Sequence, residues 1–254
     1  MIMETVSPIA FMTTYLFAPF SPTFSPPPLH HPSTLLAGLF ILHYLNRAIV
    51  SPLRSPGRSR THMVVPICGV IFNLINPPLM AAYLSAPPAP TAIEAKFFNK
   101  ISNGFSVPPS QFPFSTSVQG PPSDAWSHAS YSIGILIYFL GLISNIIHDE
   151  ILYDLRRNHP PSADGKPRYA IPKGGLYKWI SYPNYLSEWI EWTGFAIAAT
   201  AGQANRWEYT APWVFVVSEV ALMLPRAWKG HLWYHQKFRG EYPKERKVII
   251  PFLF

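Results

Sequence analysis

Long apolar stretches alternate with short polar connections along most of this chain. Five of them have the character of membrane helices, which need about 20 residues to cross the hydrocarbon core. They run roughly at 35–50, 63–84, 126–147, 184–200 and 211–224. A sixth, within 1–20, has the form of a helix that lacks its beginning. The pattern predicts an all-α, polytopic membrane bundle of about five full spans plus a partial amino-terminal one.

Two segments rich in proline and serine interrupt this pattern, at 21–33 and 87–124. Proline lacks a backbone N–H and ends helices, so both segments are expected to be loops. No sequence repeat divides the chain. We therefore expect residues 1–254 to form a single membrane-embedded domain.

Composition supports a membrane protein. Only 13% of the residues are charged, about half the share found in soluble domains, and the 8 tryptophans fit a chain with many side chains at headgroup depth. The single cysteine, Cys68, excludes an intrachain disulfide and a cysteine metal site. Motifs of Rossmann folds, P-loops, zinc proteases and thiol-redox proteins are absent from the sequence, and no metal is expected.

The formal net charge of +7 is concentrated in three connections. Basic residues gather at 51–62, at 151–181 and from 225 onward, whereas the alternate connections hold few. This alternation follows the positive-inside rule for five spans, so the basic ends and the carboxyl terminus are expected in the cytosol. These basic residues lie between apolar segments that are expected to contact membrane lipid. Membrane topology or the binding of an anionic cofactor therefore explains them better than nucleic-acid binding does.

Three polar side chains enter an apolar stretch at YPNYLSEWIEW. Asn184, Glu188 and Glu191 are four and three residues apart, so a helix places them on one stripe. An ionised residue at the centre of a span costs about 2.5 to 3.5 kcal/mol, and such residues usually face a cavity or a partner. The alternative is that the helix begins here and the stripe lies at headgroup level, paired with Lys or Arg from the next loop.

Similar polar clusters occur at the predicted cytosolic ends of two other spans. Asn145 and Asp149 are spaced i, i+4, with Arg156 about two turns later. The last span is followed by Arg226, His231, Tyr234 and His235. Together the clusters could line one pocket, with carboxylates and amides for sugar hydroxyls and bases and with cations for phosphates. An ordinary belt of snorkelling side chains is the alternative, which explains the cations better than the acids.

Glu4 and Tyr44 are candidates for a second polar group at one depth. If Pro19 and Pro32 mark the turn between antiparallel spans, Glu4 and Tyr44 lie within about one helical turn of the same depth. A carboxyl group and a phenol placed together could jointly hydrogen-bond a carbonyl oxygen. A tyrosine in a membrane helix is, however, more often a packing residue.

A family resemblance is carried by RYAIPKGGLYKWISYPNYLSEWIEWTGFAIAAT, by NIIHDEILYDLR before it and by PRAWKGHLWYHQKFRGEYPKERKVIIPFLF after it. The terminal YPKERKVIIPFLF is the most specific part. These segments, with AGLFILHYLNRAIVSPLRSPGRSR near the amino end, are similar to the steroid 5α-reductase family, the 3-oxo-5α-steroid 4-dehydrogenases. The similarity covers nearly the whole chain except the proline-rich loops, and relatives generally carry a further span and a half before Glu4.

The resemblance implies a polytopic enzyme of the endoplasmic reticulum that uses NADPH to reduce the carbon–carbon double bond conjugated to a ketone in a steroid or another hydrophobic enone. It implies that Glu4 and Tyr44 hold the substrate's carbonyl oxygen, an oxyanion-hole device. Glu191 and His231 are further candidates for the polar pocket. The residues implied to contact NADPH are Arg58, Asn145, Asp149, Arg156, Tyr169, Asn184, Glu188, Arg226 and Tyr234. Gly230 stands where relatives usually carry the first histidine of a pair.

Other functions stay open at this point. One is trans-2-enoyl-CoA reduction in very-long-chain lipid synthesis, and another is a truncated membrane protein without catalysis. A third is a membrane methyltransferase, against which the pair of Glu4 and Tyr44 argues because methyl transfer has no enolate to stabilise.

Overall fold

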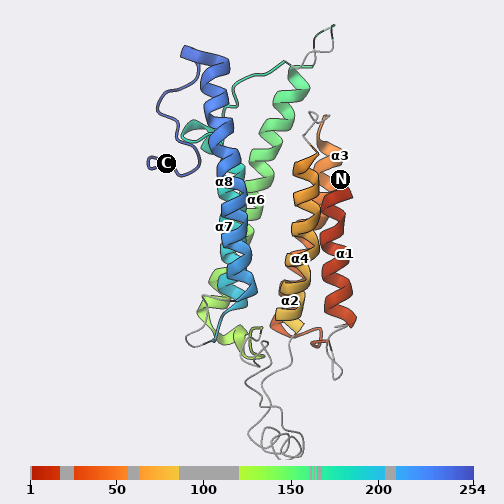
Figure 1. Ribbon diagram of the computed structural model, residues 1–254. Helices are drawn as coiled ribbons and strands as arrows, with labels where there is room; N and C mark the ends of the chain where they lie inside the picture. Colours follow the sequence, from red (N-terminus) through yellow and green to blue (C-terminus); the bar gives the residue numbers. More distant parts are fainter. Residues whose placement is uncertain are drawn as a thin grey trace, which may run out of the picture.

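A computed structural model describes residues 2–17, 26–56, 63–85, 120–160, 162, 164, 168–203 and 210–254. Within these residues, six long helices form the bundle drawn in Figure 1, together with short helical segments. The long helices are α1 (Ile2–Phe17), α2 (Pro32–Leu45), α4 (Val64–Ser85), α6 (Ala129–Asn158), α7 (Pro183–Ala199) and α8 (Ala211–Phe238). The short ones are η1 (Asn46–Val50), α3 (Ser51–Arg54), η3 (Ala125–Ser127), η4 (Gly175–Lys178) and η6 (Arg239–Glu241).

The expected all-helical membrane architecture is confirmed. Within the described residues no strand occurs, and β-pairing is limited to one parallel bridge between Ile180 and Lys247. Three described helical stretches are long and apolar enough to cross a membrane: Pro32–Arg54, Pro66–Ser85 and Ala129–Asn158. These correspond to the first three full spans expected from the sequence. The other two expected spans are helices as well, but α7 has 17 residues and α8 has a polar second half.

Two helices continue well beyond the apolar windows that predicted them. The sequence predicts spans that end near 147 and 224, whereas α6 continues to Asn158 and α8 continues through Pro225 to Phe238. Charged residues favour helices as well as apolar ones do, so hydropathy cannot detect these extensions. The expected loop 21–33 also ends earlier, because Pro32 begins α2 and His31 accepts a hydrogen bond from the Ser33 N–H. Most of the expected loop 87–124 lies outside the described residues.

Glycines allow α6 and α7 to pack backbone against backbone. A Cβ atom at Gly141 on α6 would lie 2.3 Å from the backbone nitrogen of Glu191, and one at Gly194 on α7 would lie 2.4 Å from that of Tyr138. Such distances exclude any side chain at these two positions without a shift of a helix. The contact fixes the register of α6 against α7, and with it the positions of the polar residues that both helices carry.

The basic segments lie at one end of the bundle. Figure 1 shows α3, the carboxyl ends of α6 and α8 and the start of α1 near the same end. The chain's last segment returns to the beginning of α7 there: Ser181 N–H donates to the Lys247 carbonyl at 2.9 Å and Tyr182 N–H to the Val248 carbonyl at 3.1 Å. This end therefore gathers the amino-terminal turn of α7 and the polar extensions of α6 and α8.

Candidate functional site

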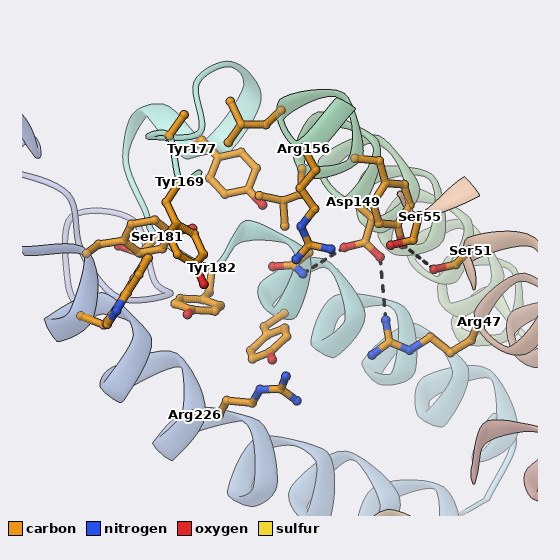
Figure 2. A pocket seen from close by; sticks show the side chains of 18 of the residues that line it. Arg47, Ser51, Ser55, Asp149, Arg156, Tyr169, Tyr177, Ser181, Tyr182 and Arg226 are labelled. Carbon is orange, nitrogen blue, oxygen red and sulfur yellow. Dashed lines mark hydrogen bonds and ion pairs between the residues drawn. The ribbon is translucent and has the colours of Figure 1, made fainter. Parts of the chain in front are cut away.

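A cavity of about 480 Å³ opens between η1, α6, α7 and α8 at this end. Cofactor and small-molecule sites have volumes of about 300 to 1,000 Å³. Figure 2 shows the polar and aromatic side chains around it. The lining includes Glu4, Arg47, Asp149, Arg156, Arg168, Tyr169, Tyr177, Tyr182, Asn184, Tyr185, Arg226 and Tyr234.

Arginines from three different elements reach into the cavity. Arg47 comes from η1, Arg156 from α6 and Arg226 from α8, and all three point toward the same space in Figure 2. Nη1 of Arg47 lies 3.8 Å from Oδ2 of Asp149. The cationic lining side chains outnumber the carboxylates Glu4 and Asp149, so the cavity carries excess positive charge. Guanidinium groups in this arrangement suit a ligand with phosphate groups.

Asn184 connects α7 to two polar residues of α6. Its Nδ2 donates a hydrogen bond to Oδ1 of Asp149 at 3.0 Å, and its backbone carbonyl accepts one from Nδ2 of Asn145 at 2.9 Å. Asn145 and Asp149 are buried and one turn apart on α6, so the i, i+4 spacing places both against Asn184, as the sequence predicts. The network orients the Asp149 carboxylate between Asn184 and Arg47.

Tyrosines form the opposite wall, where α7 begins. Burial raises the pKa of Tyr177 and of Tyr182, and the neighbouring Tyr234 phenol adds to the effect. Both side chains therefore stay neutral phenols at physiological pH and can donate hydrogen bonds to an anion. The Tyr182 hydroxyl occupies the space beside Gly230, where a Cβ atom would lie 1.6 Å from it.

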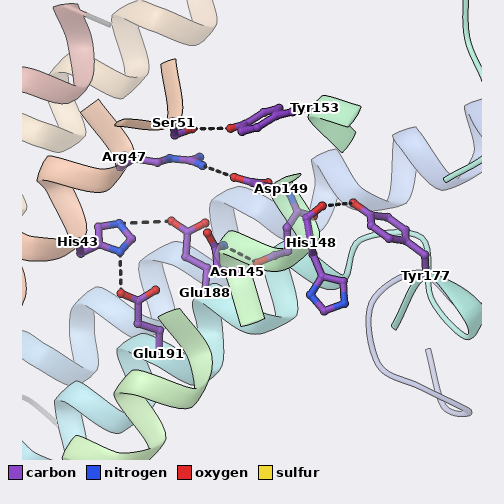
Figure 3. A network of polar contacts seen from close by, with 11 residues as sticks. His43, Arg47, Ser51, Asn145, His148, Asp149, Tyr153, Tyr177, Glu188 and Glu191 are labelled. Atoms are coloured by element: carbon purple, nitrogen blue, oxygen red, sulfur yellow. Dashed lines mark hydrogen bonds and ion pairs between the residues drawn. The ribbon is translucent and has the colours of Figure 1, made fainter. Parts of the chain in front are cut away.

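Behind the cavity, α7 turns two carboxylates toward His43 of α2. Nδ1 of His43 lies 2.7 Å from Oε1 of Glu191, and Nε2 lies 3.8 Å from Oε1 of Glu188, as Figure 3 shows. All three side chains are buried. The expectation that these acids face a partner inside the bundle agrees with this geometry. Glu188 and Glu191 contribute no lining surface to the cavity.

Glu4 and Tyr44 take different places. Glu4, in the first turn of α1, is half-buried and lines the cavity. Tyr44 is buried among aromatic rings, with ring centroids 4.8 Å from Phe40 and 6.3 Å from Trp192. The helices that carry them pack together, with the Phe11 ring of α1 stacked on the Phe40 ring of α2 at 4.1 Å between centroids. Tyr44 itself does not line the cavity.

The other predicted residues are distributed around this centre. Tyr169, Arg226 and Tyr234 line the cavity with Arg156. His231 does not line the cavity, but its Nδ1 lies 2.6 Å from Oγ of Ser181, which does. Arg58 lies outside the described residues. The geometry places the predicted side chains; their roles remain proposals.

Sequence reasoning missed several residues that the fold brings to the site. Arg47 and His43 are four residues apart, which places them on one side of a continuous helical stretch. This spacing could have identified both residues as candidates from the sequence. Arg47 also lies in the π-helical η1 segment, a feature that is frequent at functional sites. Tyr177 and Tyr182 carried no such signal, because an aromatic residue in a connection has many possible neighbours.

Comparison with known proteins agrees with the family expected from the motifs. A family model described as 3-oxo-5-alpha-steroid 4-dehydrogenase matches residues 88–254. The chain belongs to this family. Its membership in the 3-oxo-5-alpha-steroid 4-dehydrogenase family makes it an oxidoreductase of the membrane, as its apolar helices also indicate.

Individual proteins match most of the chain. An uncharacterized protein of Schizosaccharomyces pombe is 38% identical over 229 residues, which are 86% of this chain and 67% of that protein. The 3-oxo-5-alpha-steroid 4-dehydrogenase 1 of Rattus norvegicus is 30% identical over 87% of this chain and 68% of its own length. The steroid 5-alpha-reductase DET2 of Solanum lycopersicum is 32% identical over 87% of this chain and 69% of its own length.

Proposed function

We propose that this protein reduces the carbon–carbon double bond conjugated to a ketone in a Δ4-3-oxosteroid or a similar lipid enone, with NADPH as the hydride donor. One observation carries the proposal. The cavity joins three arginines and the Asp149–Asn184 network to Glu4 of α1, the helix that packs against α2, which carries the buried Tyr44. Cations suited to a dinucleotide thus lie in the same cavity as one of the two residues proposed to bind a carbonyl.

The chemistry of the lining fits a phosphorylated dinucleotide. Arg47, Arg156 and Arg226 converge from three elements, so phosphate oxygens would meet charge-assisted donors from several sides. Asp149 and Asn184 offer an acceptor and a donor to ribose or base groups. Tyr169 and Trp233 lie edge to face at 4.9 Å beside the cavity and offer aromatic surface to a ring. When bound, NADPH would supply the hydride.

The chain's own residues would act on the substrate's carbonyl. The Tyr44 phenol would donate a hydrogen bond to its oxygen, on which negative charge develops as the β-carbon accepts hydride, and the Glu4 carboxyl would donate a second one in its protonated form. The α-carbon then takes a proton from water, which completes reduction to the saturated ketone. The apolar residues around Tyr44 would exclude water and strengthen these hydrogen bonds.

The location proposed with this function is the endoplasmic reticulum membrane, with the carboxyl terminus in the cytosol. The clustering of basic segments at one end of the bundle supports this orientation. In this orientation the cavity would lie on the cytosolic side, where a soluble dinucleotide could enter while a hydrophobic substrate enters from the bilayer.

The test is conversion of a radiolabelled Δ4-3-oxosteroid by membranes that contain the full chain, with NADPH or NADH. We expect the saturated ketone with NADPH, less with NADH, and a loss of about 100-fold or more in the Tyr44→Phe and Glu4→Leu variants. Tyr83→Phe is the matched control, because the buried Tyr83 phenol donates to the Ala199 carbonyl away from the cavity. Reduction of a very-long-chain enoyl-CoA without any steroid turnover would overturn the proposed substrate class.

A further inference from the structure

One acidic residue of the apolar half of α8 has no role in the proposal above. Glu219 lies in the sequence PWVFVVSEVALML, the apolar part of α8. Phe215 and Val216, one turn earlier, are buried in the core, and Arg226, two turns later, lines the cavity. Positions separated by three, four and seven residues share one helix face. Glu219 therefore faces the bundle, whereas Val217 on the other side of α8 is 66% exposed.

Charged groups around Glu219 lie on four other elements of the bundle. They are Glu188 on α7, His43 on α2, Arg47 on η1 and Glu4 on α1. Phe215, one turn before Glu219, packs against Trp192 with ring centroids 4.5 Å apart, and the Trp192 ring lies 6.3 Å from that of Tyr44. The Glu219 carboxyl group thus belongs to the same region as the two residues proposed to hold the substrate's carbonyl.

Glu219 differs from the other acids of this region in lacking a partner. Glu188 and Glu191 face His43, and Asp149 is bonded to Asn184 and faces Arg47. Within the described residues, no hydrogen bond or ion pair forms on the Glu219 carboxyl group, and its side chain retains accessible surface. A carboxylate that has no hydrogen-bonding partner inside the bundle and lies near the carboxylates of Glu188 and Glu4 is costly, which favours the neutral acid. A neutral carboxylic acid has an O–H to donate.

We propose that Glu219 is a third carbonyl-binding residue, which as a neutral acid donates a hydrogen bond to the substrate's carbonyl oxygen beside Tyr44. A carboxylic acid kept neutral by an apolar site can stabilise a developing enolate together with a tyrosine. The acid keeps its proton throughout. The hydride of the reduction therefore still comes from NADPH and the proton from water. This inference rests on the proposed function, because it needs an enone carbonyl at Tyr44.

Two substitutions at Glu219 separate hydrogen bonding from packing. Glu219→Leu removes the donor, whereas Glu219→Gln keeps an N–H that can donate. We expect kcat/KM for the Δ4-3-oxosteroid to fall about 100-fold in the leucine variant and to be largely retained in the glutamine variant. Ser218→Ala is the control on the same helix, because its hydroxyl bonds only to the Val214 carbonyl of α8 among the described residues.

A spectroscopic measurement gives an answer that does not depend on turnover. The infrared carbonyl stretch of a ¹³C=O-labelled Δ4-3-oxosteroid is recorded on the protein with NADP⁺. Hydrogen bonds lower this frequency, so we expect a higher frequency in Glu219→Leu than in wild type, and the wild-type value in Ser218→Ala. Glu219→Gln should lie near wild type.

The outcomes separate this inference from the proposed function. If Tyr44→Phe raises the frequency and Glu219→Leu does not, the proposed function stands and the role of Glu219 is overturned. If both Glu219 variants lose activity equally and the carbonyl frequency is unchanged, Glu219 has a purely structural role. That result would also overturn the inference. A wild-type protein that neither reduces the steroid nor lowers its carbonyl frequency would refute the proposed function, and this inference with it.

Discussion

His43 on α2 and Glu191 on α7 are 148 residues apart in the sequence, and Nδ1 and Oε1 of their side chains lie 2.7 Å apart in a fully buried contact. The second oxygen of Glu191, Oε2, has no hydrogen-bond partner within the described residues. His43 is therefore the group that balances the Glu191 carboxylate inside the bundle. It also faces Glu188, so a single imidazole ties α2 to two positions of α7.

Removal of His43 alone should destabilise the protein. His43→Leu leaves the carboxylate of Glu191 buried without its imidazole partner, and breaking a buried pair in this way costs about 3 to 5 kcal/mol. Thermal unfolding in detergent micelles measures the effect. The double variant with Glu191→Leu should recover much of the loss, because neither charge then remains buried. Losses that simply add in the double variant would contradict the pairing.

Arg156 and Arg157 are neighbours in the sequence that should differ in their effect on dinucleotide binding. Arg156 lines the cavity, whereas Arg157 forms ion pairs with Glu150 and Asp154 on the outer face of α6. Arg156→Gln should weaken NADP⁺ binding about tenfold or more, because a hydrogen bond to a charged group contributes about 1.5 to 3 kcal/mol. Arg157→Gln is the matched control and should change the Kd little. Titration calorimetry decides, and equal effects would count against the cavity as the dinucleotide site.

The absence of a side chain at Gly230 should matter for the position of Tyr182. A Cβ atom at Gly230 would overlap the Tyr182 hydroxyl, so Gly230→Ala should push this phenol from its place at the cavity and weaken NADP⁺ binding. Gly240→Ala is the control, since a Cβ atom there meets nothing within 4 Å. In a double-mutant cycle with Tyr182→Ala, the two effects should be less than additive. Full additivity would mean that Gly230 acts through another residue.

Ser181 joins the chain's last segment to the site. Its Oγ lies 2.6 Å from Nδ1 of His231 and 2.7 Å from the hydroxyl of Tyr242, and it donates to the Lys247 carbonyl at 3.2 Å. Ser181→Ala should lower the free energy of unfolding by about 1 to 3 kcal/mol, since buried partners lose their hydrogen bonds. Ser127→Ala, at an exposed serine, should have little effect. An unchanged melting temperature for Ser181→Ala would show that the last segment is held by other contacts.

Local patterns in the sequence predicted the helices and several of their faces. Apolar runs located all the long helices, because burial in lipid or in the bundle core selects the same side chains. The spacing of Asn145 and Asp149 correctly placed both on the face that meets Asn184. Hydropathy did not predict the polar ends of α6 and α8, since helix formation continues where apolar character stops.

The sequence by itself determined the family, the helical membrane architecture and the concentration of polar groups at one end, because each follows from residue type and short-range spacing. Only the tertiary structure decided which polar groups meet: His43 with Glu191, Arg47 with Asp149, and the Tyr182 hydroxyl with Gly230. Such pairings depend on the rotation and register of one helix against another. Those are set by close backbone contacts such as Gly141 against Glu191, which no single helix encodes.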